Sequence, residues 1–182
     1  MIKIQNISKT YNKLAALNNV SVNLFPSQSI ALIGPNGSGK STLMKCILGL
    51  VFPNKGTIEV MGEKITFTGN YRKKIGYMTQ IVRFPDNMKV GQLFNMIQDI
   101  REEKINIDRE LIEQFEINSF INKPLGALSG GMKQKVNAAL AFMFNPDILI
   151  LDEPTAGLDP LSAELLKVKI KNEKDKGKLI II

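Results

Sequence analysis

The sequence predicts an α/β fold in which an antiparallel β subdomain comes first and a helical insertion interrupts a mostly parallel sheet. Continuous apolar runs at 30–33, 148–151 and 179–182 are typical of strands that are covered on both faces of a parallel sheet. Apolar residues at alternate positions near the N-terminus indicate half-exposed antiparallel strands. Between 88 and 144 the apolar spacing becomes helical, which predicts the insertion.

The elements follow in order along the chain. The first two strands are predicted from the apolar residues Ile2, Ile4, Ile7, Val20, Val22 and Leu24. The run IALI (Ile30–Ile33) is the first predicted parallel strand. The insertion carries two apolar stripes, one of Leu111, Ile112 and Phe115 and one of Met132, Val136, Leu140 and Met143. Six lysines within 167–178 predict a solvent-exposed helix face before the last strand.

Length and composition fit one compact domain, because 182 residues with 44% hydrophobic side chains can bury a core. We assign 1–87 and 145–182 to the core, including the antiparallel subdomain, and 88–144 to the insertion. The net charge of +7 suits nucleic acid, an anionic membrane surface or a phosphorylated ligand. The single cysteine, Cys46, excludes an internal disulfide. No apolar run reaches the roughly 18 residues of a membrane-spanning helix, and no signal peptide is apparent, so the cytosol is the expected compartment.

The stretch GPNGSGKST directly follows the IALI run and matches the phosphate-binding pattern G-x-x-x-x-G-K-[ST]. Its glycines allow backbone N–H groups to converge on phosphate oxygens at the start of the next helix. Lys40 is expected to neutralise the β- and γ-phosphates, Ser41 to bind Mg²⁺ and Thr42 to contact the α-phosphate. The sequence therefore predicts a P-loop NTPase core. Its ATP-binding residues in this loop are Gly34, Pro35, Asn36, Gly37, Ser38, Gly39, Lys40, Ser41 and Thr42.

Two adjacent carboxylates, Asp152 and Glu153, follow the apolar run ILIL. Ligands of open parallel sheets bind at the carboxyl ends of the strands. Asp152 is expected to hold Mg²⁺ through water, and Glu153 to polarise the water that attacks the γ-phosphate. Such a pair can also be a simple helix cap. Its combination with the phosphate-binding loop favours the catalytic interpretation.

The segment LSGGMKQK begins a predicted helix within the insertion, and taken alone it fits an ordinary N-capped helix. It also resembles the signature sequence, commonly LSGGQ, of the ATP-binding subunits of ABC transporters. Its signature residues are Ser129, Gly130, Gly131 and Met132, where Met132 replaces the usual Gln. The resemblance extends over essentially all 182 residues, in the order that is typical of the family.

Three more positions resemble motifs of that family. Tyr11 resembles the aromatic residue that stacks on adenine, and Gln80 in YMTQ resembles the Q-loop glutamine. Asp159 in AGLD resembles the D-loop aspartate. The resemblance implies that the catalytic residues are Glu153 and Gln80. It also implies that Ser41, Gln80 and Asp152 hold the Mg²⁺ that accompanies the substrate ATP.

The resemblance further implies how the subunit works and with what. Two copies, or this chain and a paired ATPase subunit, would meet head to tail, so that the signature of each closes over the ATP of the other. ATP binding would close the dimer and hydrolysis would open it. This cycle would drive a transmembrane permease on a separate chain, in a bacterial exporter. The subunit would be cytoplasmic and peripheral on the inner face of the cell membrane.

In this family the strand at 179–182 is followed by a turn with a histidine that contacts the γ-phosphate, and this chain contains no histidine. We therefore expect the C-terminal end of the core to be missing. We also expect Leu179–Ile182 to lack part of their packing and ATP hydrolysis by the 182-residue chain to be slow. An ATP-binding module with impaired turnover is the alternative interpretation.

Two other functions remain open. A DNA-maintenance ATPase would suit the positive charge, but such proteins place a long coiled coil or a large domain between the two motifs. Here Lys40 and Ser129 are 89 positions apart without sustained heptads, so a nucleic-acid partner is not expected. An ATPase that acts on the ribosome usually joins two such modules, whereas this chain has one.

Overall fold

The computed structural model describes residues 1–67, 69–102 and 105–182. The strands are β1 (Ile2–Tyr11), β2 (Leu14–Leu24), β3 (Ser29–Ile30), β4 (Lys55–Val60), β5 (Glu63–Lys64), β6 (Ile75–Met78), β7 (Ile148–Leu151) and β8 (Leu179–Ile181). The α-helices are α1 (Lys40–Ile47), α2 (Val90–Arg101), α3 (Glu110–Gln114), α4 (Gly130–Phe142) and α5 (Pro160–Asp175). Short 3₁₀ helices are η1 (Asn70–Lys74), η2 (Ile117–Phe120) and η3 (Leu125–Ala127).

The N-terminal part forms an antiparallel sheet in the order β2-β1-β4-β5. Ile2, Ile4 and Ile7 of β1 are buried. The pairing of β1 with β2 shifts register between Ile4 and Ile7, where Asn6 has a φ of 51°. This irregularity explains why the apolar spacing lengthens from two residues to three. Val22 of β2, the edge strand of the sheet, is 38% exposed, whereas Leu24 of the same strand is buried.

The second sheet is parallel and has the order β3-β8-β7-β6. Alternate residues of β7 face opposite sides. Ile148 and Ile150 pack in the apolar cluster that includes α1 and the antiparallel sheet. Leu149 and Leu151 pack in a second cluster, with α2, α3 and α4. Both faces of this strand are therefore covered, as its continuous apolar run predicts.

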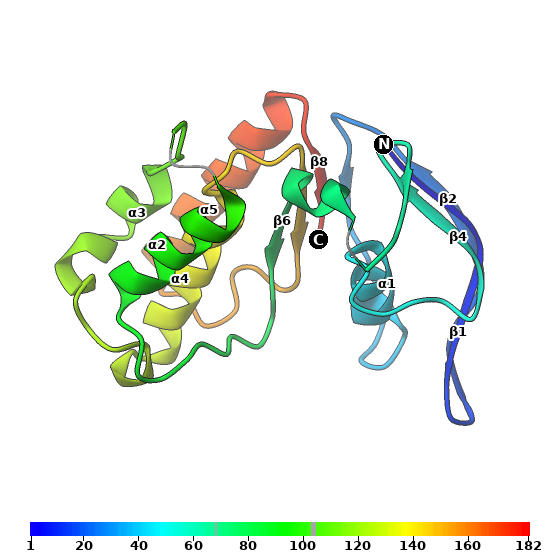
Figure 1. The fold of residues 1–182 in the computed structure, drawn as a ribbon, viewed down its shortest axis with the longest axis horizontal. Helices are drawn as coiled ribbons and strands as arrows, with labels where there is room; N and C mark the ends of the chain where they lie inside the picture. Colours follow the sequence, from blue (N-terminus) through cyan, green and yellow to red (C-terminus); the bar gives the residue numbers. More distant parts are fainter. Residues whose placement is uncertain (68, 103–104) are drawn as a thin grey trace.

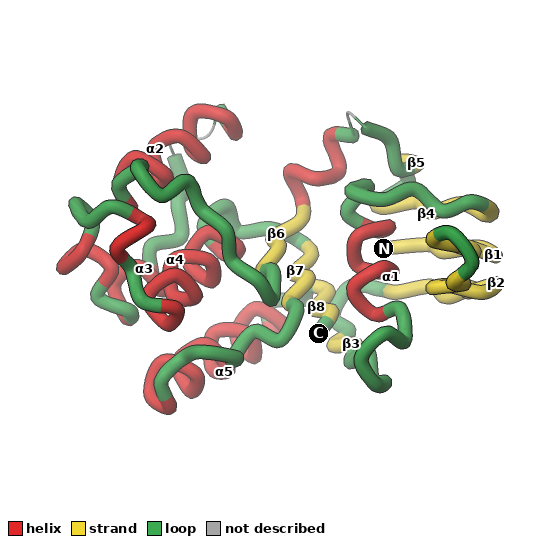
Figure 2. Tube along the Cα trace, turned by 90° about the horizontal axis from the view of Figure 1, so that it is seen from below, coloured by secondary structure: helices red, strands yellow, loops and turns green. Residues whose placement is uncertain are grey.

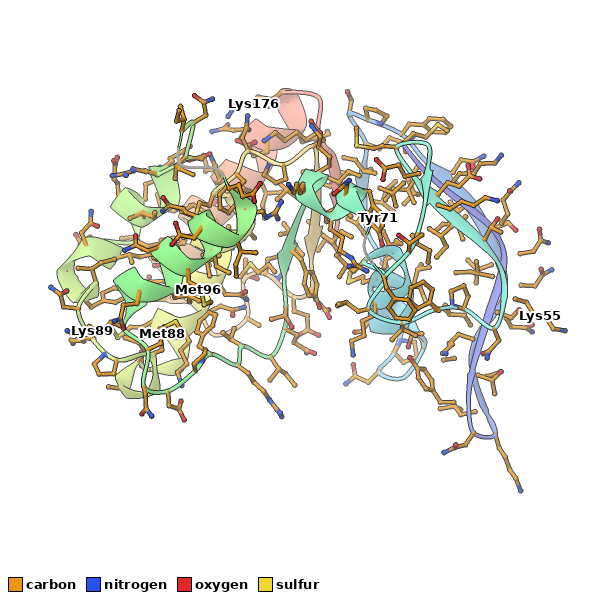
Figure 3. The ribbon with its side chains drawn as sticks, viewed as in Figure 1. Lys55, Tyr71, Met88, Lys89, Met96 and Lys176 are labelled. Carbon is orange, nitrogen blue, oxygen red and sulfur yellow. The ribbon has the colours of Figure 1, made fainter. Side chains whose placement is uncertain are left out.

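The molecule is layered, as Figures 1 and 2 show from two directions. Helix α1 lies between the antiparallel and the parallel sheet, while α2 to α5 cover the other face of the parallel sheet. Figure 3 places Lys55 at the antiparallel end and Met88 and Met96 at the helical end. The α/β architecture with two kinds of sheet is thus confirmed. No helix in the described part of the chain is long and apolar enough to cross a membrane.

Two expectations about the parallel strands are wrong, the second only in part. The run Ile30–Ile33 is not a strand covered on both faces, since β3 ends at Ile30 and Ile33 is 92% exposed. Within the described part of the chain β3 is an edge strand, with β8 as its one neighbour. Of the residues Leu179–Ile182, which were expected to lack part of their packing, the first three are at most 1% exposed, because apolar clusters cover both faces of β8. Ile182 is half-buried and lines a cavity, so the expectation is not contradicted there.

The helical segment buries both predicted stripes. Leu111, Phe115, Val136 and Met143 are in the core, with Ile112, Met132 and Leu140 packed against it. The lysine-rich helix α5 departs from its prediction at one position. Lys169 is only 1% exposed and forms ion pairs with Asp108, Glu110 and Glu173. Glu173, one turn along α5, is equally buried, whereas Asp108 and Glu110 come from a distant part of the sequence and are partly exposed. These three carboxylates make the burial of the lysine tolerable.

Candidate functional site

The glycine-rich loop turns directly into α1, and its last residue, Gly39, is the N-cap of that helix. Gly39 has a φ of 97°, in the left-handed region that favours glycine. A Cβ atom at this position would also lie 2.3 Å from the carbonyl oxygen of Ala16 on β2. The close approach of β2 therefore requires glycine here. It fixes the phosphate-binding loop against the antiparallel sheet.

The side chain of Lys40 folds back over this loop. Its ammonium group donates hydrogen bonds to the carbonyl oxygens of Gly34 (2.6 Å) and Pro35 (3.0 Å). It adds a positive charge beside the first N–H groups of α1, which are free of intrahelical partners. Residues 34–38 are exposed. The result is an exposed, positively charged loop at the start of α1, whose chemistry fits the phosphates of a nucleotide.

The opposite end of α1 is held by Arg72. Its guanidinium donates to the carbonyl oxygens of Leu48 (2.9 Å) and Gly49 (3.1 Å), and also to two carbonyls of the segment after β5. A positive charge is favourable at a helix C-terminus. Figure 3 shows the neighbouring Tyr71 beside α1. Its buried hydroxyl occupies the space that a Cβ atom on Gly49 would need, at 2.4 Å.

Ser41 and Asp152 meet across the site. The Ser41 hydroxyl donates a 3.1 Å hydrogen bond to Asp152 Oδ2. Asp152 follows β7, and its N–H donates to the carbonyl of Met78 at the end of β6 (2.9 Å). Gln80 comes two residues after Met78 and is exposed. Because β6 and β7 are parallel and paired, both candidate ligands lie at the same edge of the sheet.

This donor set fits Mg²⁺. A hydroxyl, a carboxylate and an amide oxygen are hard ligands, which Mg²⁺ prefers and supplements with water and phosphate oxygens. The described residues contain no group of three or more His, Cys, Asp or Glu side chains that could hold a metal ion by themselves. A nucleotide-dependent Mg²⁺ site is therefore the chemistry that these residues favour.

Glu153 is exposed and has an unusual backbone conformation. Its φ of 50° lies in the left-handed region, and its carbonyl accepts a 3.0 Å hydrogen bond from the N–H of Ala156. Such a conformation in a residue other than glycine is sparsely populated, and it is often found at active sites. The backbone at Glu153 therefore turns away from the extended course of the β7 residues before it.

A cavity of about 690 Å³ borders Glu153 on the side of α5 and the end of β8. Its wall includes Ile170 and Ile182. None of the residues 34–42 lines it, so it is separate from the phosphate-binding loop. The geometry of Lys40, Ser41 and Asp152, rather than the size of a cavity, locates the candidate nucleotide site.

Tyr11 lies at the end of β1, opposite Leu14 in the hairpin with β2. Its ring is 42% exposed, and the Lys9 ammonium lies 5.2 Å from the ring centroid. The same hairpin contacts Gly39 through Ala16. The aromatic ring is thus accessible for stacking with a nucleobase, on the side of the glycine-rich loop that β2 approaches.

The signature segment lies apart from this loop, because α1 and α4 pack on opposite faces of the parallel sheet. Ser129 is the N-cap of α4, and its hydroxyl accepts a 3.3 Å hydrogen bond from the N–H of Met132. Gly130 is exposed, and a Cβ atom on Gly131 would lie 3.0 Å from the carbonyl oxygen of Gly157. Met132 is half-buried against the helical core.

Asp159 is the N-cap of α5. It accepts hydrogen bonds from the N–H (2.8 Å) and the hydroxyl (2.7 Å) of Ser162, and it pairs with Lys135 of α4 at 2.9 Å. The backbone hydrogen bond of Ser162, then its hydroxyl and Lys135, hold the pKa of Asp159 well below its usual range. The D-loop candidate therefore has a local structural role as well.

The contacts that link these segments could not be predicted from the local sequence pattern. They involve Ala16, Arg72, Gln134, Lys135 and Asn137. One signal was present for two of them. Gln134 and Asn137 are three positions apart, on the same helix face as the small apolar residues Ala138 and Ala141, so polar side chains there had to be buried.

Comparisons with known proteins agree with this geometry. A family model described as "ABC transporter" matches residues 17–156. The lantibiotic transport ATP-binding protein SrtF of Streptococcus pyogenes is 34% identical over 100% of this chain and 79% of that protein. The Nod factor export ATP-binding protein I of Burkholderia lata is 31% identical over 100% of this chain and 61% of that protein.

Among solved structures, a dimeric post-hydrolysis state of the ATP-binding cassette MJ0796, bound to ADP and Pi, is similar over 100% of this chain and 86% of that chain. Its TM-score is 0.87 and its sequence identity is 26%. These similarities confirm the family that the motifs predict. The chain belongs to the ABC transporter family and covers the nucleotide-binding domain of its ATP-binding proteins.

Proposed function

We propose that this chain binds MgATP at residues 34–42 and hydrolyses it in a head-to-tail dimer to drive a membrane-embedded permease on a separate chain. The observation that carries the proposal is the hydrogen bond between Ser41 and Asp152. Lys40, the residue before Ser41, adds an ammonium group that is bonded to carbonyl oxygens of the glycine-rich loop. The start of α1 thus carries a cation and a hydroxyl, with a carboxylate bonded to the hydroxyl. That is the arrangement that phosphoryl transfer needs.

Each residue has a role in this reaction. Lys40 moves from the loop carbonyls to the β- and γ-phosphates and neutralises their charge. Ser41, Asp152 and Gln80 hold Mg²⁺, which when bound neutralises charge that develops on the phosphate oxygens. Glu153 accepts the proton of the attacking water. Tyr11 stacks on the adenine ring.

The position of the signature segment supports a dimer. Ser129, Gly130 and Gly131 begin α4, which packs on the far side of the parallel sheet from α1. This separation from the glycine-rich loop of the same chain supports a role at the ATP of another subunit. The N-terminus of α4 offers free N–H groups for the γ-phosphate of that ATP. The similar cassette MJ0796 was solved as a dimer with ADP and Pi. The partner here is a second copy or a paired ATPase subunit.

The transported cargo leaves the cell in this proposal. The support is the names of two relatives, which refer to lantibiotic transport and to Nod factor export. The chain acts at the cytoplasmic face of the membrane through its permease. Exposed residues after β6, such as Gln80 and Ile81, are the proposed contact with that permease.

Calorimetric titration with MgATP, together with phosphate release, tests the proposal. We expect the wild-type chain to bind MgATP, and Lys40→Ala to weaken binding on the order of 10-fold or more. Lys45→Ala, an exposed position on the same helix, is the matched control and should bind like the wild type. The proposal fails if the wild type does not bind MgATP, or if Lys40→Ala binds it equally well.

Phosphate release separates hydrolysis from the alternative of ATP binding with impaired turnover. Release that depends on Glu153 would support the hydrolase, whereas MgATP binding with no release above the Glu153→Gln background would support the alternative.

A further inference from the structure

The signature helix α4 is bonded to the backbone that leads into Gln80. Asn137 Nδ2 donates a 2.9 Å hydrogen bond to the carbonyl oxygen of Thr79. Asn137 is only 6% exposed. The carbonyl of Thr79 and the N–H of Gln80 belong to one planar peptide group. A hydrogen bond that fixes the orientation of the Thr79 carbonyl therefore also fixes the orientation of the Gln80 N–H in the same peptide plane.

Gln134 extends this contact by one helical turn. Its Oε1 accepts a 3.3 Å hydrogen bond from Asn137 Nδ2, so the two hydrogens of the Asn137 amide have separate acceptors. Gln134 is 4% exposed, and its Nε2 has no hydrogen-bond partner among the described residues. A buried donor without an acceptor is unfavourable, and in native structures it is often found where a group has a second arrangement or a functional role.

Other residues of α4 reach the second loop of the site. Lys135 pairs with Asp159 at 2.9 Å, and Gly131 approaches the carbonyl of Gly157. Helix α4 is thus linked to the segment after β6 and to the segment after β7. These segments carry the two candidate catalytic residues, Gln80 and Glu153. Its own N-terminus carries Ser129, which is placed to meet the ATP of another subunit.

We propose that Asn137 is a positioning residue, which sets the orientation of Gln80 by holding the Thr79–Gln80 peptide group to the signature helix. A displacement of α4, when Ser129 engages the γ-phosphate of the other subunit's ATP, is then transmitted to Gln80 through this bond. Gln134 supports Asn137 by fixing its side-chain amide. This inference rests on the proposed function only for its effect on catalysis, because the link itself exists in the nucleotide-free chain.

A purely structural role for Asn137 makes a different prediction. An amide buried on an apolar helix face is costly, and leucine has the same number and branching of side-chain heavy atoms and better helix propensity. If Asn137 served only packing, Asn137→Leu would leave Gln80 unaffected. If Asn137 positions Gln80, Asn137→Leu would free the Thr79 carbonyl and loosen the segment after β6, while α4 itself stays folded.

Hydrogen exchange in the nucleotide-free protein tests the link directly. We expect the amides of residues 79–82 to exchange about 10-fold faster in Asn137→Leu than in the wild type, as for the loss of one local hydrogen bond. The amides within α4 should keep their exchange rates. Gln134→Met should produce a smaller increase in the same residues. Lys133→Ala, on the same helix, is the control and should change neither set.

A double-mutant cycle tests the consequence for catalysis. We expect Asn137→Leu to lower kcat on the order of 10-fold or more, to raise the Mg²⁺ concentration needed for half-maximal turnover, and to leave the Kd for ATP without Mg²⁺ unchanged. In a Gln80→Ala background, Asn137→Leu should have no further effect on kcat. An equal loss in both backgrounds would show that Asn137 acts independently of Gln80 and would overturn the inference.

The two experiments separate this inference from the proposed function. Unchanged exchange at 79–82 in Asn137→Leu overturns the inference, whether or not the chain binds MgATP. Faster exchange in a chain that does not bind MgATP supports the link between α4 and Gln80 while the proposed function fails. Faster exchange together with the non-additive loss of kcat supports both.

Discussion

The Ser41 hydroxyl donates a 3.1 Å hydrogen bond to Asp152 Oδ2, and this bond joins residues that are 111 positions apart in the sequence. Ser41 is at the start of α1, on one face of the parallel sheet, and Asp152 is at the carboxyl end of β7. The contact closes the site between the glycine-rich loop and the sheet. It also keeps two candidate oxygen ligands together in the chain without a nucleotide.

The first prediction concerns the metal. Asp152→Asn keeps the size of the side chain but removes its negative charge. We therefore expect it to raise the Mg²⁺ concentration needed for half-maximal ATP binding on the order of 10- to 100-fold. The measurement is a Mg²⁺ titration at constant ATP. Asp147→Asn is the control, because Asp147 precedes the same strand at its other end. An unchanged Mg²⁺ requirement in Asp152→Asn would show that the metal is held elsewhere.

The second prediction concerns the general base. Glu153→Gln preserves shape but cannot accept a proton, so phosphate release should fall by about 10²- to 10⁴-fold. The Kd for MgATP should be nearly unchanged. Because the variant retains the γ-phosphate, it should also accumulate in MgATP as a dimer of the 20.2 kDa chain, which size-exclusion chromatography with light scattering would detect. If Glu153→Gln released phosphate at the wild-type rate, another residue would be the general base.

The sequence predicted the parts of the molecule that depend on local pattern. The loop at 34–42, the strand at 148–151 and the apolar stripes of the insertion each rest on spacing that backbone geometry imposes. All three are found as elements of the expected kind. The candidate nucleotide site could be predicted because its loop and its carboxylates both adjoin such elements.

The errors arose where neighbours in space decide the outcome. Ile33 has the composition of a buried strand residue, but β3 is at the sheet edge, and strand order cannot be read from a local pattern. In the sequence, Lys169 cannot be distinguished from the exposed lysines of α5. It is buried because α5 packs against the insertion, where it pairs with Asp108 and Glu110. Asn137 was missed for the same reason, since its acceptor lies 58 positions away.

The third prediction concerns the buried lysine. Lys169 Nζ lies 2.6 Å from Asp108 and from Glu110, and these bonds tie α5 to the segment that begins α3. Lys169→Met would leave the carboxylates without their cation. We expect it to lower the free energy of unfolding by about 1.5–3 kcal/mol, the range for a hydrogen bond to a charged group. The loss is not larger because both carboxylates are partly exposed to solvent.

Urea denaturation followed by circular dichroism measures this loss. Lys171→Met is the matched control, because Lys171 is exposed on the same helix, and it should change stability by less than about 0.5 kcal/mol. Equal stability of the two variants would mean that the cluster contributes little to holding the insertion on the core.

The fourth prediction is a pH dependence that originates at Glu173. Burial alone would raise its pKa, but hydrogen bonds from Lys176 and Lys178 and the charge of Lys169 lower the pKa to about 2, from a usual value of 4.5. A lowered folded-state pKa means that the unfolded chain takes up the proton first. The stabilising contribution of Glu173 is therefore complete above about pH 4.5 and is lost as the pH falls towards 2.

Urea denaturation of the wild type and of Glu173→Gln between pH 6 and pH 2.5 measures this contribution. At pH 6 the wild type should be more stable, by on the order of 2 kcal/mol, and the difference should shrink steadily below pH 4.5 because the unfolded wild type becomes protonated. Asp175→Asn, which changes an exposed carboxylate in the last turn of α5, should show no such convergence. A difference between wild type and Glu173→Gln that stays constant down to pH 2.5 would mean that Glu173 stabilises α5 by its shape and not by its charge.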